Sequence, residues 1–128
     1  MAQLRDLVFD ATAPYRTAQF WAAALDGYQI APYDEDELER LRASGVARVE
    51  DDPHVLVTGG AGAPRLWFQR VPEPKTVKNR LHPDVFADDL TAEAERLSEL
   101  GARLLQVFDD HALMADPEGN EFCLYPNG

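Results

Sequence analysis

The feature that most constrains the fold is an order of elements that occurs twice along the chain. Each half begins with a strand that leads into an amphipathic helix, and three short strands follow the helix. The opening strand and helix are predicted at residues 4–10 and 14–25 in the first half, and at residues 81–87 and 90–100 in the second. A chain with this order can bury two apolar helices against two sheets, which predicts an α+β fold.

The joint between the halves lies at residues 71–75, which contain two prolines. We therefore predict one domain over residues 1–128, with a first module of about residues 1–71 and a second of about 80–128. The remaining strands are predicted at residues 28–30, 55–58, 65–70, 103–107, 112–115 and 121–125. The first half is longer because residues 34–45 form an extra predicted helix. The order repeats, but sequence identity between the halves is too weak to demonstrate a duplication.

The last strand follows a tight turn, Asp116-Pro117-Glu118-Gly119-Asn120. Pro117 presets φ, and Gly119 can adopt the positive φ that such a turn requires. In the strand that follows, Phe122 and Leu124 alternate with more polar residues, so the two sets face opposite sides of the sheet.

The same alternation runs through the other opening and closing strands and predicts one apolar and one mixed face. The apolar face holds Leu7, Phe9, Leu66, Phe68, Leu81, Val85, Ala87, Phe122 and Leu124. The mixed face holds Asp6, Val8, Asp10, Trp67, Gln69, His82, Asp84, Phe86, Glu121 and Cys123. The mixed face is either plain solvent surface or the lining of a concave pocket, and its aromatic side chains favour the pocket.

The formal net charge of −11 excludes most nucleic-acid functions, because such a surface repels phosphates. No apolar run reaches the length of a membrane span, and no signal peptide is evident, so we expect a cytoplasmic protein without a membrane partner. The acidic residues at 34–37 and 50–52 are interpreted as solvated helix-start and loop charges, and His54 and His111 as exposed. The single cysteine, Cys123, excludes an intramolecular disulfide and a multi-cysteine metal cluster.

The order of elements, with several local motifs, resembles the vicinal oxygen chelate superfamily, which includes glyoxalase I, extradiol dioxygenases and bleomycin-resistance proteins. The motifs are Phe20-Trp21, Leu25-Asp26-Gly27-Tyr28, Leu81-His82 and the turn at residues 116–120, and the stretch 66–82 resembles a glyoxalase-like subgroup. The resemblance implies two βαβββ modules that form a half-open barrel around a cleft, and a homodimer.

In metal-dependent members of the superfamily, the ligands come from the first and last strand of each module. By resemblance these positions are Asp6, Gln69, His82 and Cys123, with Glu121 two residues before the last of them on the same face. One carboxylate, one amide, one imidazole and one thiol depart from the histidine and carboxylate ligands of ordinary sites. We therefore expect no metal cofactor, and a divalent metal held by Asp6, His82 and Glu121 is the alternative.

Two functions stay open at this point. The first is a metal-free module that binds a small cationic or neutral molecule, with Asp6, Trp67, Gln69, His82, Glu121 and Cys123 as the candidate ligand-binding residues. The second is a glyoxalase-type lyase, isomerase or dioxygenase, in which Glu121 or Asp6 would be the general base and His82 its proton partner or a metal ligand. Cys123 as a nucleophile is a third hypothesis.

Overall fold

A computed structural model describes residues 1–127, which divide into two compact units. The N-terminal unit covers Met1–Pro74, and the C-terminal unit begins at Lys75. Within the described residues, no helix is long and apolar enough to cross a membrane.

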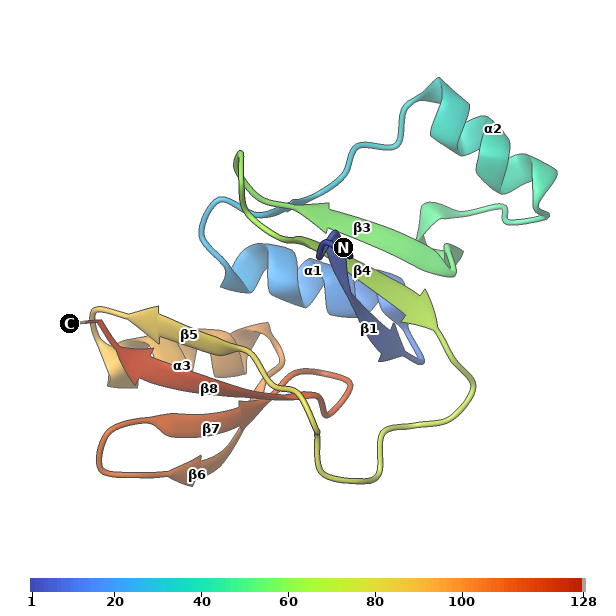
Figure 1. The fold of residues 1–128 in the computed structure, drawn as a ribbon. Helices are drawn as coiled ribbons and strands as arrows, with labels where there is room; N and C mark the ends of the chain where they lie inside the picture. The colour runs from blue at the N-terminus through green and yellow to red at the C-terminus, as the bar shows by residue number, and fades with distance from the viewer. Residues whose placement is uncertain (128) are drawn as a thin grey trace. The chain divides into compact units, whose positions relative to one another are not determined.

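The N-terminal unit is a four-stranded mixed sheet with helices (Figure 1). Its elements are β1 (Asp6–Ala11), α1 (Pro14–Ala24), β2 (Gln29–Ile30), α2 (Glu35–Ala43), a 3-10 turn (Val49–Asp51), β3 (His54–Thr58) and β4 (Arg65–Arg70). The strand order is β1-β4-β3-β2, with β1 and β4 parallel and the other pairs antiparallel. The sheet is open, and β1 forms one of its edges.

The core of this unit lies between α1 and one face of the sheet. Phe68 is fully buried, and its ring stacks on Phe9 with 5.2 Å between ring centroids. Phe9 in turn stacks on Trp21 of α1 at 5.9 Å. Leu66 and Phe68 alternate with Trp67 and Gln69 along β4, so burial of the first pair turns the second pair to the opposite face.

The C-terminal unit repeats this topology without an α2 equivalent. Its elements are β5 (Asp84–Ala87), α3 (Leu90–Leu100), β6 (Arg103–Val107), β7 (Ala112–Ala115) and β8 (Glu121–Pro126). The strand order is β5-β8-β7-β6, and only the β5–β8 pair is parallel. Phe122, Leu124 and Met114 are buried with Leu97 of α3.

The turn between β7 and β8 is held by the side chain of Asp116, which is 1% exposed. Its Oδ1 accepts hydrogen bonds from the backbone N–H groups of Glu118 and Asn120, both at 2.9 Å. Gly119 has φ of 90°, which is the positive value expected from the sequence. The turn motif is therefore a closed hydrogen-bonded unit that directs the chain into β8.

The α+β class and the two βαβββ modules are confirmed. The closing of the two sheets around a common cleft stays a prediction.

Most element bounds differ from the predicted ones by one or two residues, but the strand predicted over residues 81–87 begins only at Asp84. Pro83 interrupts it because proline has no N–H to donate to the ladder. Pro83 still accepts a hydrogen bond from Cys123 N at 2.9 Å, so His82 lies next to the sheet although it precedes the strand.

Candidate functional site

The mixed face of the N-terminal sheet forms the floor of a cavity of about 580 Å³. Val8, Leu56, Trp67 and Gln69 come from three adjacent strands and line this floor. The segment between β2 and β3, which includes α2, forms the wall with Ala31, Pro32, Tyr33, Glu37, Arg40 and Asp52. Arg5 and His54 complete the lining. The extra helix predicted from the sequence therefore has a structural role at this site.

Trp67 is held in place by Asp6. The indole N–H donates to Oδ2 of Asp6 at 3.1 Å, and Arg65 donates to both carboxylate oxygens at 2.7 and 2.9 Å. Hydrogen bonding to Arg65 lowers the pKa of Asp6 and outweighs the opposing effect of burial. Because its only polar atom is already paired, Trp67 presents an apolar ring to the cavity.

Asp52 anchors the cavity wall. It is 1% exposed, and its carboxylate accepts hydrogen bonds from the Tyr33 hydroxyl at 2.8 Å and from His54 N at 3.0 Å. Arg40 lies 3.8 Å from the same carboxylate and also donates to Glu37. Burial and the hydrogen bond to Asp52 raise the pKa of Tyr33 far above its ordinary value. Tyr33 is therefore a neutral phenol that links the α2 segment to the sheet.

The charges around the cavity balance. Two arginines, Arg5 and Arg40, and two acidic residues, Glu37 and Asp52, are among the lining residues, and the floor is largely apolar. Such a cavity suits a flat, neutral molecule that stacks on Trp67, with Gln69 and His54 as polar groups that fix its orientation. The excess of acidic residues in the whole chain is therefore not repeated in the lining of this cavity.

Only Trp67 and Gln69, of the six predicted ligand-binding residues, line the cavity. Asp6 supports it through Trp67. Gln69 also donates to Asp10 at 3.2 Å. The other three residues belong to the C-terminal unit.

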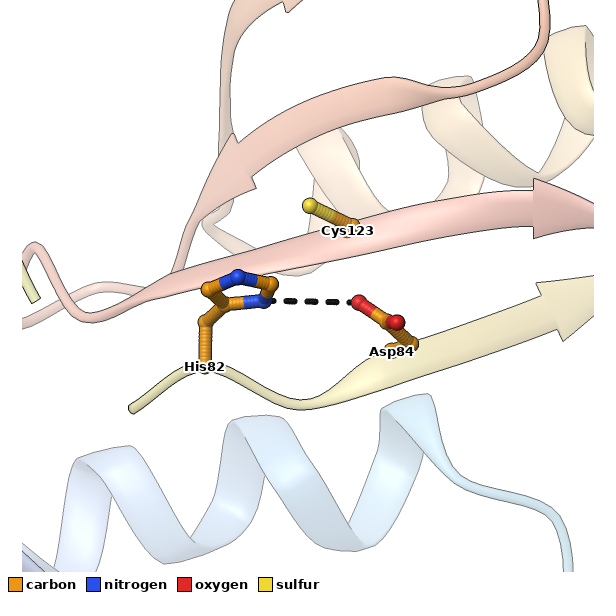
Figure 2. Close-up of side chains that lie close together, drawn as sticks. All are labelled: His82, Asp84 and Cys123. Atoms are coloured by element: carbon orange, nitrogen blue, oxygen red, sulfur yellow. Dashed lines mark ion pairs between the residues drawn. The ribbon is translucent and has the colours of Figure 1, made fainter. Parts of the chain in front are cut away.

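In the C-terminal unit, the structure brings His82 and Cys123 together and adds Asp84 (Figure 2). Asp84 pairs with Cys123 across the β5–β8 ladder, and Nδ1 of His82 lies 3.3 Å from Oδ1 of Asp84. Burial raises the pKa of the Cys123 thiol, which weakens the hypothesis of a cysteine nucleophile.

Glu121 has a different role. Its carboxylate accepts from Lys78 Nζ at 2.8 Å and from Asn79 N at 2.9 Å, and Asn79 Oδ1 accepts from Glu121 N at 3.2 Å. The hydrogen bond from Lys78 lowers the pKa of Glu121. Glu121 thus holds residues 75–79 against the sheet. The two roles predicted for Glu121, as a general base and as a metal ligand, would each require these contacts to break.

The backbone register shows which residues occupy equivalent positions in the two modules, and one of these pairs differs from the pair expected from the sequence. Asp6 and His82 do match, since each lies five residues before the last paired residue of its strand, Ala11 or Ala87. Ala11 pairs with Arg70, whereas Ala87 pairs with Pro126. The residue of the first module that occupies the position equivalent to Cys123 is therefore Trp67, and the residue equivalent to Tyr125 is Gln69.

The expected match of Gln69 with Cys123 rests on the position of each residue three places before a proline, Pro72 or Pro126, and the backbone register contradicts it. Pro126 is the last residue of β8, whereas Pro72 lies two residues beyond the end of β4. By backbone register, Asp6 of the first module matches His82 of the second, and Trp67 matches Cys123. An indole does not ligate a metal, and both oxygens of Asp6 are bound to Arg65. These four residues do not fit the metal site of the metal-dependent enzymes.

Sequence reasoning missed Tyr33, Arg40 and Asp52 as site residues. Asp52 was interpreted as a solvated loop charge, but it is buried. His54 is exposed as expected, yet it begins β3 and lines the cavity. The alternation of His54 and Leu56 with buried Val55 and Val57 was the available signal, since it places His54 and Leu56 on the mixed face.

His111 is not simply exposed either. Its ring lies between those of Phe108 and Tyr125, with centroid distances of 4.5 and 4.7 Å. Its Nδ1 is 2.6 Å from Oδ1 of Asp110, and this contact lowers the pKa of Asp110.

Several solved structures share this fold. A hypothetical protein, SA1046 from S. aureus, matches with a TM-score of 0.67 and 14% identity, over 99% of this chain and 95% of that one. The fosfomycin resistance protein FosX from Mesorhizobium loti matches with a TM-score of 0.66 and 14% identity, over 100% and 94%. Glyoxalase I from Leishmania major matches with a TM-score of 0.59 and 13% identity, over 98% and 87%.

Comparison with curated protein sequences gave no match. The family model of the glyoxalase-like domain matches residues 6–125, which is nearly the whole chain. The chain therefore belongs to the glyoxalase-like domain family.

Proposed function

We propose that this chain is a small-molecule-binding protein of the vicinal oxygen chelate type, which holds its ligand in the N-terminal cavity without the superfamily's usual metal site. The observation that carries the proposal is the cavity of about 580 Å³ with Trp67 on its floor. Cavities of roughly 300–1,000 Å³ with apolar walls and a few polar groups are typical of ligand sites.

The absence of the usual ligand set supports this proposal over metal chemistry. In the N-terminal unit, the position that corresponds to Cys123 carries Trp67, and Asp6 is neutralised by Arg65. The guanidinium supplies the positive charge that a metal would otherwise bring to this carboxylate. A neutral, flat ligand can stack on the indole without meeting an unpaired charge.

A thermal-shift screen of flat aromatic antibiotics and small organic acids tests the proposal. A ligand that binds only the folded state raises the melting temperature, and the shift grows with the logarithm of the ratio of free ligand concentration to Kd once that ratio is large. Val8 lies on the cavity floor and is 55% exposed, so Val8→Arg should fill the cavity without damage to the core. Val77→Arg is the matched control, because Val77 is 74% exposed and does not line the cavity.

We expect at least one compound class to stabilise the wild type and Val77→Arg but not Val8→Arg. Equal stabilisation of all three proteins would place binding elsewhere and refute the proposed site. No stabilisation by any compound at millimolar concentration would contradict a binding function for these ligand classes.

The second candidate is a glyoxalase-type lyase, isomerase or dioxygenase with a divalent metal. His82 favours it, since this imidazole occupies a position where metal-dependent members carry a ligand and lies 3.3 Å from Asp84. Turnover of glyoxalase or dioxygenase substrates that is lost on chelation and in His82→Ala would favour the enzyme over the binding module.

The proposal retains a homodimer and a cytoplasmic location. Light scattering coupled to size-exclusion chromatography tests the first, with a monomer mass as the contradicting result. Fractionation of the source cells tests the second.

A further inference from the structure

The C-terminal unit contains a cluster of three different metal-binding groups that the proposed function does not use. We propose that His82, Asp84 and Cys123 form a three-ligand site for a thiophilic divalent cation, with Zn²⁺ as its natural occupant. This site would be built by one module alone, and Asp84 is not among the positions carried over from the superfamily.

Backbone pairing places the three side chains on one face of the sheet. Asp84 and Cys123 are direct partners in the parallel β5–β8 ladder. His82 precedes β5, and its Nδ1 lies 3.3 Å from Oδ1 of Asp84, so these two side chains lie side by side. Cys123 N donates to Pro83 O at 2.9 Å, which fixes the register of the segment between His82 and Asp84. Figure 2 shows the imidazole of His82 and the carboxylate of Asp84 turned toward each other, with Cys123 on the neighbouring strand.

The distances suit a small cation. One ligand atom from each of His82, Asp84 and Cys123 lies within 4.8 Å of the others. Tetrahedral Zn²⁺ with bonds of about 2.0–2.3 Å holds its ligand atoms about 3.3–3.8 Å apart. The side chains of His82 and Asp84 are 42% and 57% exposed, so rotation about their side-chain torsions can close the remaining gap. Cys123 is 6% exposed and provides the fixed point of the site.

The donor set selects for Zn²⁺ among the common divalent ions. An imidazole nitrogen, a carboxylate oxygen and a thiolate sulfur match its borderline-soft character, whereas Mg²⁺ and Ca²⁺ prefer oxygen ligands alone. On binding, the Cys123 thiol would release its proton to solvent as the sulfur–metal bond forms, and no change in oxidation state is needed. Three protein ligands leave one coordination position open to water or to a small anion.

The other acidic groups near the family positions are already neutralised, which distinguishes this cluster. Asp6 is paired with Arg65, and Glu121 is paired with Lys78. Among the residues that the structure describes, the ionic partner of Asp84 is His82, and Sγ of Cys123 makes no hydrogen bond. A cation would thus satisfy groups that the protein itself leaves without strong partners.

Cobalt titration tests the site directly, with Co²⁺ as a spectroscopic probe for Zn²⁺. The full chain is stripped with chelator and titrated with Co²⁺ under reducing conditions. We expect a near-ultraviolet thiolate-to-cobalt charge-transfer band that saturates at one ion per chain and disappears when Zn²⁺ is added. Cys123→Ser should abolish the band, and His82→Ala should weaken Zn²⁺ binding by more than about 100-fold, since even outer-shell changes cost about 10–100-fold.

Asp84→Asn keeps the test decisive if Cys123→Ser fails to fold, because Asp84 is exposed and its replacement should leave the fold intact. This variant should weaken Zn²⁺ binding, measured by calorimetry, by at least about 10-fold. His111→Gln is the matched control and should bind as the wild type does, because His111 lies outside the cluster. A folded wild type without the charge-transfer band, or equal Zn²⁺ affinity for Asp84→Asn and His111→Gln, would overturn the proposal.

Discussion

Asp52 gives the sharpest test of how the cavity wall is held. Asp52→Ala removes a buried carboxylate that accepts from the Tyr33 hydroxyl at 2.8 Å and from His54 N at 3.0 Å. A hydrogen bond to an ionised acceptor contributes about 1.5–3 kcal/mol to the free energy of unfolding. The Arg40 contact adds little, because it is long and the arginine side chain is 48% exposed. We therefore expect Asp52→Ala, which removes both hydrogen bonds, to lower the free energy of unfolding by about 3–6 kcal/mol.

Both tryptophans, Trp21 and Trp67, belong to the N-terminal unit, so tryptophan fluorescence during urea unfolding reports this unit alone. Tyr33→Phe removes only one of the two hydrogen bonds and should cost about 1.5–3 kcal/mol. Asp51→Ala is the matched control: Asp51 is exposed and lies 3.7 Å from Arg48, so a change within about 0.5 kcal/mol is expected.

A phenol titration gives a second readout. In Asp52→Ala, the pKa of Tyr33 should move towards the ordinary tyrosine value of about 10, because the neighbouring negative charge is gone. An unfolding curve for Asp52→Ala that coincides with that of Asp51→Ala would refute the anchoring role of Asp52.

Two further predictions concern the C-terminal unit and are measured by far-ultraviolet circular dichroism. The hydrogen bond from Lys78 lowers the pKa of Glu121 in the folded protein below its ordinary value of 4.5. The ionised carboxylate therefore stabilises the fold at pH values above 4.5, and this stabilisation is lost as the pH falls through the lower pKa of the folded state. Glu121→Gln should therefore melt below the wild type near neutral pH and converge with it in acid; a gap that is constant with pH would contradict this. Gly119→Ala should cost about 1–2 kcal/mol because φ is 90° there, with no clash to add, since the nearest atom to a new Cβ is 3.7 Å away. Gly60→Ala, where the space is open and φ is not positive, is the control, and equal losses in both variants would show that the turn is not strained.

The fold could be predicted because two kinds of signal are local: the alternation of apolar and polar residues along strands, and the residues that begin and end helices. Leu66 and Phe68 alternate with Trp67 and Gln69, and the buried pair is the one expected. Gly101 ends α3 with φ of 121°, and Asp89 caps its start by accepting from Ala92 N. Such signals depend on a few neighbouring residues and survive without knowledge of the rest of the chain.

The site was predicted only in part because it depends on register and on an insertion. A shift of two residues keeps a side chain on the same face, so alternation cannot distinguish Trp67 from Gln69 as the counterpart of Cys123. The pairing of Ala11 with Arg70 and of Ala87 with Pro126 decides this, and neither pairing can be read from spacing to a proline. Asp52 looked like one more surface acid, and only the fold brings Tyr33 to it.

The central claim is that a small molecule stacks on Trp67 in the N-terminal cavity, and the two indole N–H signals of the chain test it most directly. Trp67 lines the cavity, whereas Trp21 is 1% exposed in the core, so the second indole is an internal control. The signals are assigned in nitrogen–proton correlation spectra with Trp67→Phe, and the strongest binder from the thermal-shift screen is then titrated. We predict a saturable shift of the Trp67 signal with little change at Trp21. A ligand that stabilises the protein and leaves the Trp67 signal unmoved would contradict the account.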